Sequence, residues 1–284
     1  MQRSNGGNMP GRNVIPAVAL AVVLLVPGSG AHAFDDALYP DWSGGWNRIG
    51  PGDFDPSKPR GLGQQAPLIP EYQKIWEASV ADQARGGQGN DPGYRCNIHG
   101  MPRIMNGVLP IQFLVLPETT YVMPELSSIL RRIYTDGRDW PERLPRSPTG
   151  YSIGRWLDTD GDGRYDTLVA ETRGMKNPRS YDSSGTPFHQ DEQTIVIERI
   201  HLDNAKPDIL VNEMTVLDHA LTRPWSIVRT FQRNREPVWG ESICSEDNHH
   251  VVIANEDYLV SWDGFLMPVN KGQKPPDLRY FKAP

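Results

Sequence analysis

The cleanest strand signal in the chain is the stretch Trp225-Ser226-Ile227-Val228-Arg229-Thr230-Phe231-Gln232-Arg233. Apolar and polar side chains largely alternate along it, and successive side chains of a strand point to opposite faces of a sheet. The pattern therefore indicates a strand with one buried and one solvated face. Apolar residues also dominate residues 194–202 and 209–217, although they alternate less regularly there.

Several shorter apolar runs lie upstream. The predicted strands among them are residues 111–116, 119–123, 129–135, 151–157 and 167–172. The first two are expected to form a hairpin around Pro117-Glu118. Short strands at this spacing, with turn residues between them, predict a mainly β chain: an antiparallel meander, closed or nearly closed into a barrel.

One helix is predicted, at residues 70–85, because Pro70 suits a first helical turn and Gly86-Gly87 ends the pattern. Its expected buried face consists of Tyr72, Ile75, Trp76, Ser79 and Val80. The glycine- and proline-rich residues before the helix are expected to run over the surface. We expect one domain at residues 34–284, with an irregular segment plus helix (34–100), core strands (101–233) and a C-terminal extension (234–284).

The first 33 residues have the pattern of a signal peptide. Arg3 and Arg12 precede an apolar run at residues 14–26, and Ala31-His32-Ala33 is a small-x-small cleavage motif. The run is shorter than the ~20 residues that span a bilayer, which disfavours the alternative of a membrane anchor. We therefore expect cleavage after Ala33 and a periplasmic or secreted protein without a further membrane span.

The charge of the chain disfavours several classes of partner. It carries 29 basic and 35 acidic side chains, and loss of the first 33 residues, with their two arginines, leaves a net charge of −8. No long basic run occurs, so neither nucleic acid nor an anionic lipid surface is an expected partner.

The chain contains only two cysteines, Cys96 and Cys244. In an oxidising compartment an isolated pair is typical of a disulfide. A catalytic thiol would leave one cysteine over, and a cysteine metal site would need closer ligands.

Six short motifs follow one another in order: Gly100-Met101-Pro102-Arg103-Ile104-Met105, Arg131-Arg132-Ile133-Tyr134-Thr135-Asp136-Gly137-Arg138, Ser152-Ile153-Gly154-Arg155-Trp156, Asp166-Thr167-Leu168-Val169, Glu198-Arg199 and Arg223-Pro224-Trp225. Together they resemble a large family of exported bacterial proteins of unknown function, for which a lipocalin-like barrel is expected. Gly44-Gly45-Trp46 also resembles the Gly-x-Trp signature of lipocalins, whose Trp plugs one end of the barrel. The resemblance covers residues 42–246 and implies a fold rather than an activity.

An acidic turn departs from that family pattern. Asp158, Asp160 and Asp162 alternate, with Asp166 following, as in the front half of a calcium loop. Val169 stands where an EF-hand has its bidentate Glu, which excludes a helix–loop–helix site. Two interpretations stay open: a hairpin that binds Ca²⁺, or a solvated turn whose Asp-Gly steps supply turn geometry.

A set of polar residues in the strand region could carry catalysis. The candidates are His189, Asp136, Arg138, Arg103, Tyr134 and Glu198. His189 is flanked by Asp191 and Glu192 and would act as a general base near neutral pH. The alternative is that the same residues form structural ion pairs or cap loops. Nucleotide-binding, zinc-peptidase and serine-hydrolase motifs are absent from the sequence, so no organic cofactor is expected.

Three functions follow from these patterns. The first is an exported lipocalin-like protein that binds a small, largely apolar or aromatic molecule in the barrel. The second is a lyase, isomerase or hydrolase without a cofactor, with His189 or Asp136 as base and Arg103 or Arg138 stabilising an anion. The third is a structural envelope protein without a ligand. The direction in which these side chains point distinguishes the three.

Overall fold

A computed structural model describes residues 35–50, 64–107, 109–126, 129–240, 244, 249–254, 256–261 and 263–275. All of them belong to one compact unit, residues 34–284. The expected signal peptide, residues 1–33, lies outside the described residues.

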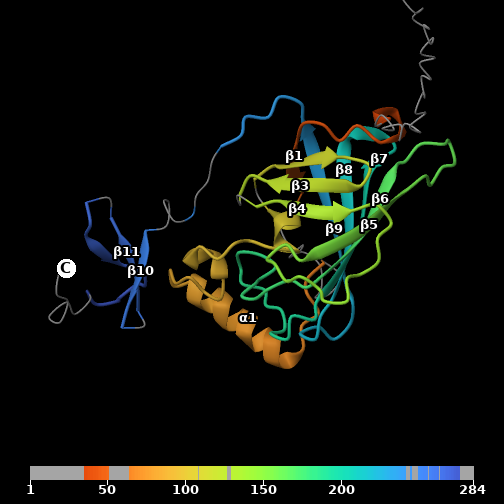
Figure 1. The fold of residues 1–284 in the computed structure, drawn as a ribbon. Coiled ribbons are helices and arrows are strands. Elements are labelled where there is room, and N and C mark those ends of the chain that lie inside the picture. Colours follow the sequence, from red (N-terminus) through yellow and green to blue (C-terminus); the bar gives the residue numbers. More distant parts are fainter. Residues whose placement is uncertain are drawn as a thin grey trace, which may run out of the picture. The chain divides into compact units, whose positions relative to one another are not determined.

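Nine strands close into a β-barrel in which every strand pairs with its neighbour in sequence and the last pairs with the first (Figure 1). The strands are β1 (Gly45–Ile49), β2 (Ile111–Val115), β3 (Thr119–Pro124), β4 (Arg131–Tyr134), β5 (Tyr151–Leu157), β6 (Thr167–Arg173), β7 (Ile195–Asp203), β8 (Lys206–Leu217) and β9 (Trp225–Asn234). The predicted mainly β barrel is confirmed. The eight predicted barrel strands match β2 to β9, with small shifts at their ends.

Side-chain alternation decides which residues fill the barrel. Every second residue of β9, from Trp225 to Arg233, is buried, and the residues between them are exposed or half-buried. The aromatic and aliphatic side chains that face inward form one hydrophobic core with Trp42 and Trp46. The solvated outer face lies on the opposite side of each pleat.

Strand β1 was not predicted from the sequence, because turn-forming residues surround it. Gly45 to Ile49 nevertheless pair with Asn234 to Thr230 of β9, and Gly45 and Trp46 pair with β2. Gly44 enters the strand with φ of +91°, a conformation that favours glycine. Trp46 is fully buried, donates its indole N–H to the Trp42 carbonyl at 3.0 Å and packs against the Arg233 guanidinium. The expectation that this segment runs over the surface is therefore wrong for Gly45–Ile49.

One strand pair departs from the antiparallel rule. β4 and β5 are parallel, with Ile133 opposite Ser152 and Tyr134 opposite Ile153, while the other pairs of the barrel are antiparallel. Parallel strands need a long connection that returns to the starting edge. Residues 135–150 provide it, and we call this segment the crossover.

Helix α1 (Pro70–Gln83) lies across one end of the barrel (Figure 1). Tyr72 and Ser79 are its buried residues, whereas Ile75 and Val80 are each 39% exposed. The predicted apolar face is thus rotated. The helix docks through polar contacts: Ser79 Oγ donates to the Ser184 carbonyl, and the Trp76 indole donates to Ser184 Oγ.

The predicted C-terminal extension contains a three-stranded antiparallel sheet of its own. Its strands are β10 (His250–Ile253), β11 (Glu256–Val260) and β12 (Leu266–Pro268). The predicted disulfide is present between Cys96 and Cys244, with Cα atoms 5.4 Å apart. Among the described residues, no helix is both long enough and apolar enough to cross a membrane.

Candidate functional site

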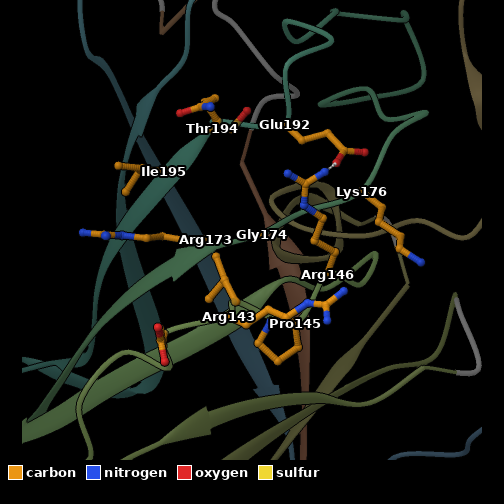
Figure 2. Close-up of a pocket in the computed structure, with 12 residues that line it drawn as sticks. Arg143, Pro145, Arg146, Arg173, Gly174, Lys176, Glu192, Thr194 and Ile195 are labelled. Carbon is orange, nitrogen blue, oxygen red and sulfur yellow. Dashed lines mark hydrogen bonds and ion pairs between the residues drawn. The ribbon is translucent and has the colours of Figure 1, made fainter.

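The crossover covers part of the outer barrel wall and borders a cavity of about 1050 Å³ that is partly open to solvent (Figure 2). The cavity lies between residues 142–146 of the crossover, the end of β6 and the residues that lead into β7. Gly174, with φ of +70°, lets the chain pass close beneath the crossover, because a Cβ there would lie 2.9 Å from the Pro145 carbonyl oxygen.

This cavity is cationic although the whole chain is acidic. Its lining includes Arg143, Arg146, Arg173 and Lys176 against two carboxylates, those of Glu142 and Glu192. Figure 2 shows that Arg146 is paired with Glu192. Arg173 is paired with Glu171 at 2.5 Å. Arg143 and Lys176, in contrast, have no carboxylate within ion-pair distance among the described residues. We call this the cationic cavity.

A second hollow, of about 410 Å³, lies on the outer face of β5, β6 and β7 and is mainly apolar. Its apolar walls are Ile153, Val169 and Ile197, with Trp140 of the crossover beside them. Ile197 is 44% exposed. We call this the apolar hollow.

Arg173 and Trp140 connect the two spaces. Arg173 lines the cationic cavity, and its guanidinium carbon lies 4.6 Å from the centre of the Trp140 ring, which lines the apolar hollow. Ile195 and Ile197 are two residues apart on β7, share its outer face and line the cavity and the hollow, respectively. The arrangement suits a molecule with one anionic and one apolar end.

The barrel interior holds Glu198, which was one of the six catalytic candidates. Its carboxylate forms a two-fold ion pair with Arg131 of β4, and both side chains are at most 1% exposed. Arg131 also donates to Thr172 Oγ1 at 3.0 Å, and Asn212 Nδ2 donates to Glu198 at 2.9 Å. We call these residues, together with Ser152, the lumen cluster. Their side chains fill this part of the lumen, so the candidate binding site lies on the outer wall instead of inside the barrel.

Tyr134, Asp136 and Arg138 lie together where the crossover begins. The Arg138 guanidinium stacks on Tyr134, with its central carbon 3.8 Å from the ring centre, and donates to both carboxylate oxygens of Asp136. These hydrogen bonds hold the pKa of Asp136 below its usual value, so the carboxylate is a weak base. The trio anchors the path of the crossover.

Arg103 contacts a different set of residues, on the loops that carry Asp91 and Ser180. It pairs with the buried Asp91, to which its Nη2 donates at 3.0 Å, and it donates to Ser180 Oγ at 2.9 Å. Burial, aided by the Arg103 charge, lowers the pKa of the neighbouring His99 to about 4. Its contacts make Arg103 a link between two loops.

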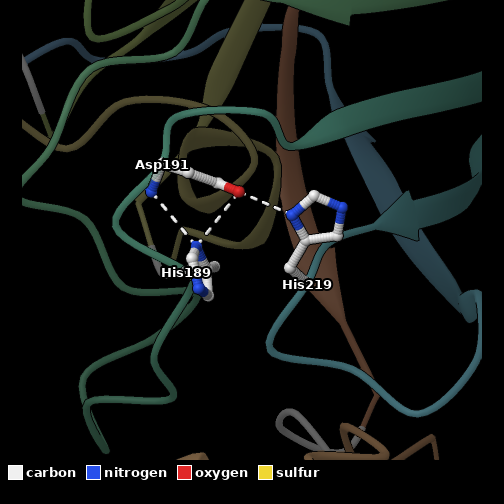
Figure 3. Close-up of side chains that lie close together, drawn as sticks. All are labelled: His189, Asp191 and His219. Atoms are coloured by element: carbon white, nitrogen blue, oxygen red, sulfur yellow. Dashed lines mark hydrogen bonds and ion pairs between the residues drawn. The ribbon is translucent and has the colours of Figure 1, made fainter.

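His189 lies apart from the other five candidates, beside Asp191 and His219 (Figure 3). Its backbone N–H donates to Asp218 at 2.9 Å, and its ring packs on Tyr72 of α1, with ring centres 5.7 Å apart. The six candidates thus fall into four separate groups, and the described contacts do not join these groups into one catalytic site.

The acidic turn is exposed, and its carboxylates bind its own backbone. Asp158 accepts hydrogen bonds from the N–H groups of Gly161 and Gly163, at 2.7 and 2.9 Å. Asp166 accepts from the Thr159 backbone N–H and hydroxyl. Ligand oxygens of Asp158, Asp160 and Asp162 lie within 4.8 Å of one another. Ca²⁺ binding at this turn stays a prediction.

Calcium at 1 mM is expected to raise the melting temperature if the turn binds it like other extracellular modules. With a Kd of about 0.1 to 1 mM, the stabilisation would be about 0.4 to 1.4 kcal/mol, or about 1 to 4 °C. Differential scanning calorimetry with CaCl₂ and with chelator measures the shift, and Asp160→Asn should reduce it. Identical melting curves in calcium and in chelator would show that the turn does not bind Ca²⁺.

No family model matches the chain, and no curated protein matches it significantly. The resemblance to exported barrel proteins therefore rests on the motifs alone.

Sequence reasoning missed the residues that line the two spaces. Arg143 and Lys176 are separated by 33 positions, and Trp140 and Ile197 by 57. Each looks like an ordinary surface or strand residue, and only the path of the crossover brings them together. His219 was missed because it lies on the connection from β8 to β9, 28 positions from Asp191, and only the fold brings the two together. The acidic residues beside His189 were a usable signal.

Proposed function

We propose that this chain is an exported β-barrel protein that binds a small amphipathic anion on its outer wall. The anionic group would lie in the cationic cavity and the apolar body in the apolar hollow. The observation that carries the proposal is a cationic cavity that adjoins an apolar surface and contains two cations, Arg143 and Lys176, without an ion-pair partner among the described residues.

Three physical arguments support this choice of ligand. Cations that line a concave site and lack carboxylate partners attract an anion, and guanidinium groups bind carboxylate or phosphate through two parallel hydrogen bonds. Apolar side chains in the adjoining hollow gain about 0.8 kcal/mol for each CH₂ group that they remove from water. A ligand pocket is typically apolar with a few polar groups that fix orientation, which the combination of cavity and hollow provides.

The disulfide is consistent with export, because such bonds persist in oxidising compartments. The expected apolar or aromatic ligand is retained, but as one part of the molecule and on the outer wall. The catalytic alternative, with His189 or Asp136 as base and Arg103 or Arg138 as the anion-stabilising group, stays a prediction; of these pairs, Asp136 and Arg138 are in contact.

Decanoate is a suitable probe, with inorganic phosphate and acetate for comparison. Arg143→Gln/Lys176→Gln is expected to weaken decanoate binding about tenfold or more, since loss of 1.4 kcal/mol of binding energy costs that factor. Isothermal titration calorimetry measures it. The matched control, Lys74→Gln/Lys206→Gln, removes two exposed cations outside the cavity and should leave the affinity unchanged.

A second pair of variants tests the apolar part. Ile197→Asp should weaken decanoate about fivefold or more and leave any binding of phosphate nearly unchanged. Val228→Asp is its control, because Val228 is also 44% exposed but lies on the outer face of β9. The proposal fails if decanoate does not bind, or if the control pairs weaken binding as much as the cavity variants.

A further inference from the structure

His189, Asp191 and His219 form a cluster of potential metal ligands separate from the proposed anion site (Figure 3). One ligand atom of each residue lies within 4.8 Å of the other two. His189 and Asp191 lie on the connection from β6 to β7, whereas His219 lies on the connection from β8 to β9. Two imidazoles and one carboxylate are a donor set that Zn²⁺ accepts.

The two distances from Asp191 to the histidines are close to those of a tetrahedral site. Asp191 Oδ2 lies 3.1 Å from His189 Nδ1 and 2.5 Å from His219 Nδ1. Zinc ligands at about 2.0 to 2.2 Å from the metal lie about 3.3 Å from one another in a tetrahedron. The first distance already fits, and the second would need to open by less than about 1 Å. The His219 side chain is 69% exposed and can make that movement.

Asp218 holds the two connections together behind the cluster. Its carboxylate accepts hydrogen bonds from the backbone N–H groups of His189 and Ala220, at 2.9 and 2.8 Å, and from the Thr194 hydroxyl. Its side chain is fully buried. Because Asp218 lies between the segments that carry His189 and His219, it fixes their separation before any ion binds, as outer-shell groups do in metal sites.

The hydrogen bonds also place lone pairs where a cation would bind. His189 Nδ1 accepts a hydrogen bond from the Asp191 backbone N–H at 3.2 Å, so the proton of the neutral ring is on Nε2. Nδ1 and Asp191 Oδ2 then present lone pairs to each other across 3.1 Å. A cation between them would remove this repulsion.

We infer that His189, Asp191 and His219 bind one Zn²⁺ ion, with a fourth position open to water. The open position follows from exposure: all three side chains are reached by solvent, by 37%, 27% and 69% respectively. A zinc site with three protein ligands and one water is the arrangement that activates water or binds an anion. This inference does not depend on the proposed function.

The test uses the full chain without a histidine tag, dialysed against chelator. Isothermal titration with ZnCl₂ should give one ion per chain, and Co²⁺ should give the visible absorption bands of a tetrahedral site. His219→Ala and Asp191→Asn are each expected to weaken Zn²⁺ binding at least about tenfold, since even outer-shell changes cost 10–100-fold. Circular dichroism should show that both variants stay folded.

Two histidines outside the cluster provide matched controls. His201→Ala and His249→Ala each remove one imidazole and should leave the stoichiometry and affinity unchanged. The inference is overturned if the wild-type chain binds no stoichiometric Zn²⁺, in which case the three residues form a hydrogen-bonded relay. It is also overturned if His219→Ala binds as tightly as the wild type, or if the His249 variant loses the ion.

Discussion

Replacing Glu198 by alanine is expected to lower the free energy of unfolding by about 3 to 5 kcal/mol, because the change leaves the Arg131 charge buried without its partner. Arg131 is 0% exposed and receives its only carboxylate contact among the described residues from Glu198. Thr172 and Ser152 offer it hydroxyl groups but no negative charge. Urea unfolding followed by circular dichroism measures the loss.

Two comparisons show whether the loss of stability comes from leaving the Arg131 charge buried without a partner or from removing any carboxylate. Glu213→Ala removes a side chain that is 51% exposed and 3.7 Å from Arg199, and should cost less than about 1 kcal/mol. The double change Arg131→Met/Glu198→Leu removes both charges and should recover most of the stability lost in Glu198→Ala. If Glu198→Ala costs no more than Glu213→Ala, the lumen cluster does not stabilise the barrel.

The lumen cluster also favours the proposed binding site on the outer wall over one inside the barrel. Five strands, β4 to β8, contribute polar side chains to it, and each hydrogen bond fixes the position of its neighbours. A ligand in this part of the lumen would have to replace these hydrogen bonds as well as displace the side chains. The outer wall imposes no such cost, and there the crossover supplies a concave surface.

Strands were predicted correctly where the pattern of apolar and polar residues within the segment itself indicates a strand. In β9 the alternation of apolar and polar side chains can be read from one segment, and the observed strand matches the predicted bounds within one residue at each end. β1 has only five residues and lies among turn formers. Its pairing of Gly45 with Asn234 joins positions almost two hundred residues apart, and no local pattern encodes such a partner.

The candidate site could be predicted only in pieces. His189 was recognisable because a titratable ring stood next to acidic residues, Asp191 and Glu192. Arg143 and Trp140 carry no local signal, because their role depends on the parallel pairing of β4 and β5. A sixteen-residue connection is compatible with a loop that leads to an antiparallel partner or with a crossover, and long-range pairing decides between the two.

The second large effect is expected from the disulfide. Cys96 and Cys244 are 148 positions apart, and the loop between them contains strands β2 to β9. Cross-linking so long a loop lowers the entropy of the unfolded chain, and the chain-entropy argument gives about 3 to 5 kcal/mol of stabilisation. Cys96→Ala/Cys244→Ala should therefore unfold at a clearly lower denaturant concentration than the oxidised wild type.

Reduction of the wild-type protein supplies the matched control, because it breaks the same bond without changing the sequence. A reductant should lower the unfolding midpoint of the wild type to that of Cys96→Ala/Cys244→Ala and leave the midpoint of the double variant unchanged. Chain made in a reducing cytoplasm should show the lower midpoint until it is oxidised, which connects the stability of the barrel to export. Equal midpoints for the oxidised wild type and the double variant would contradict this prediction. They would mean that the disulfide lowers the entropy of the folded state as much as that of the unfolded chain.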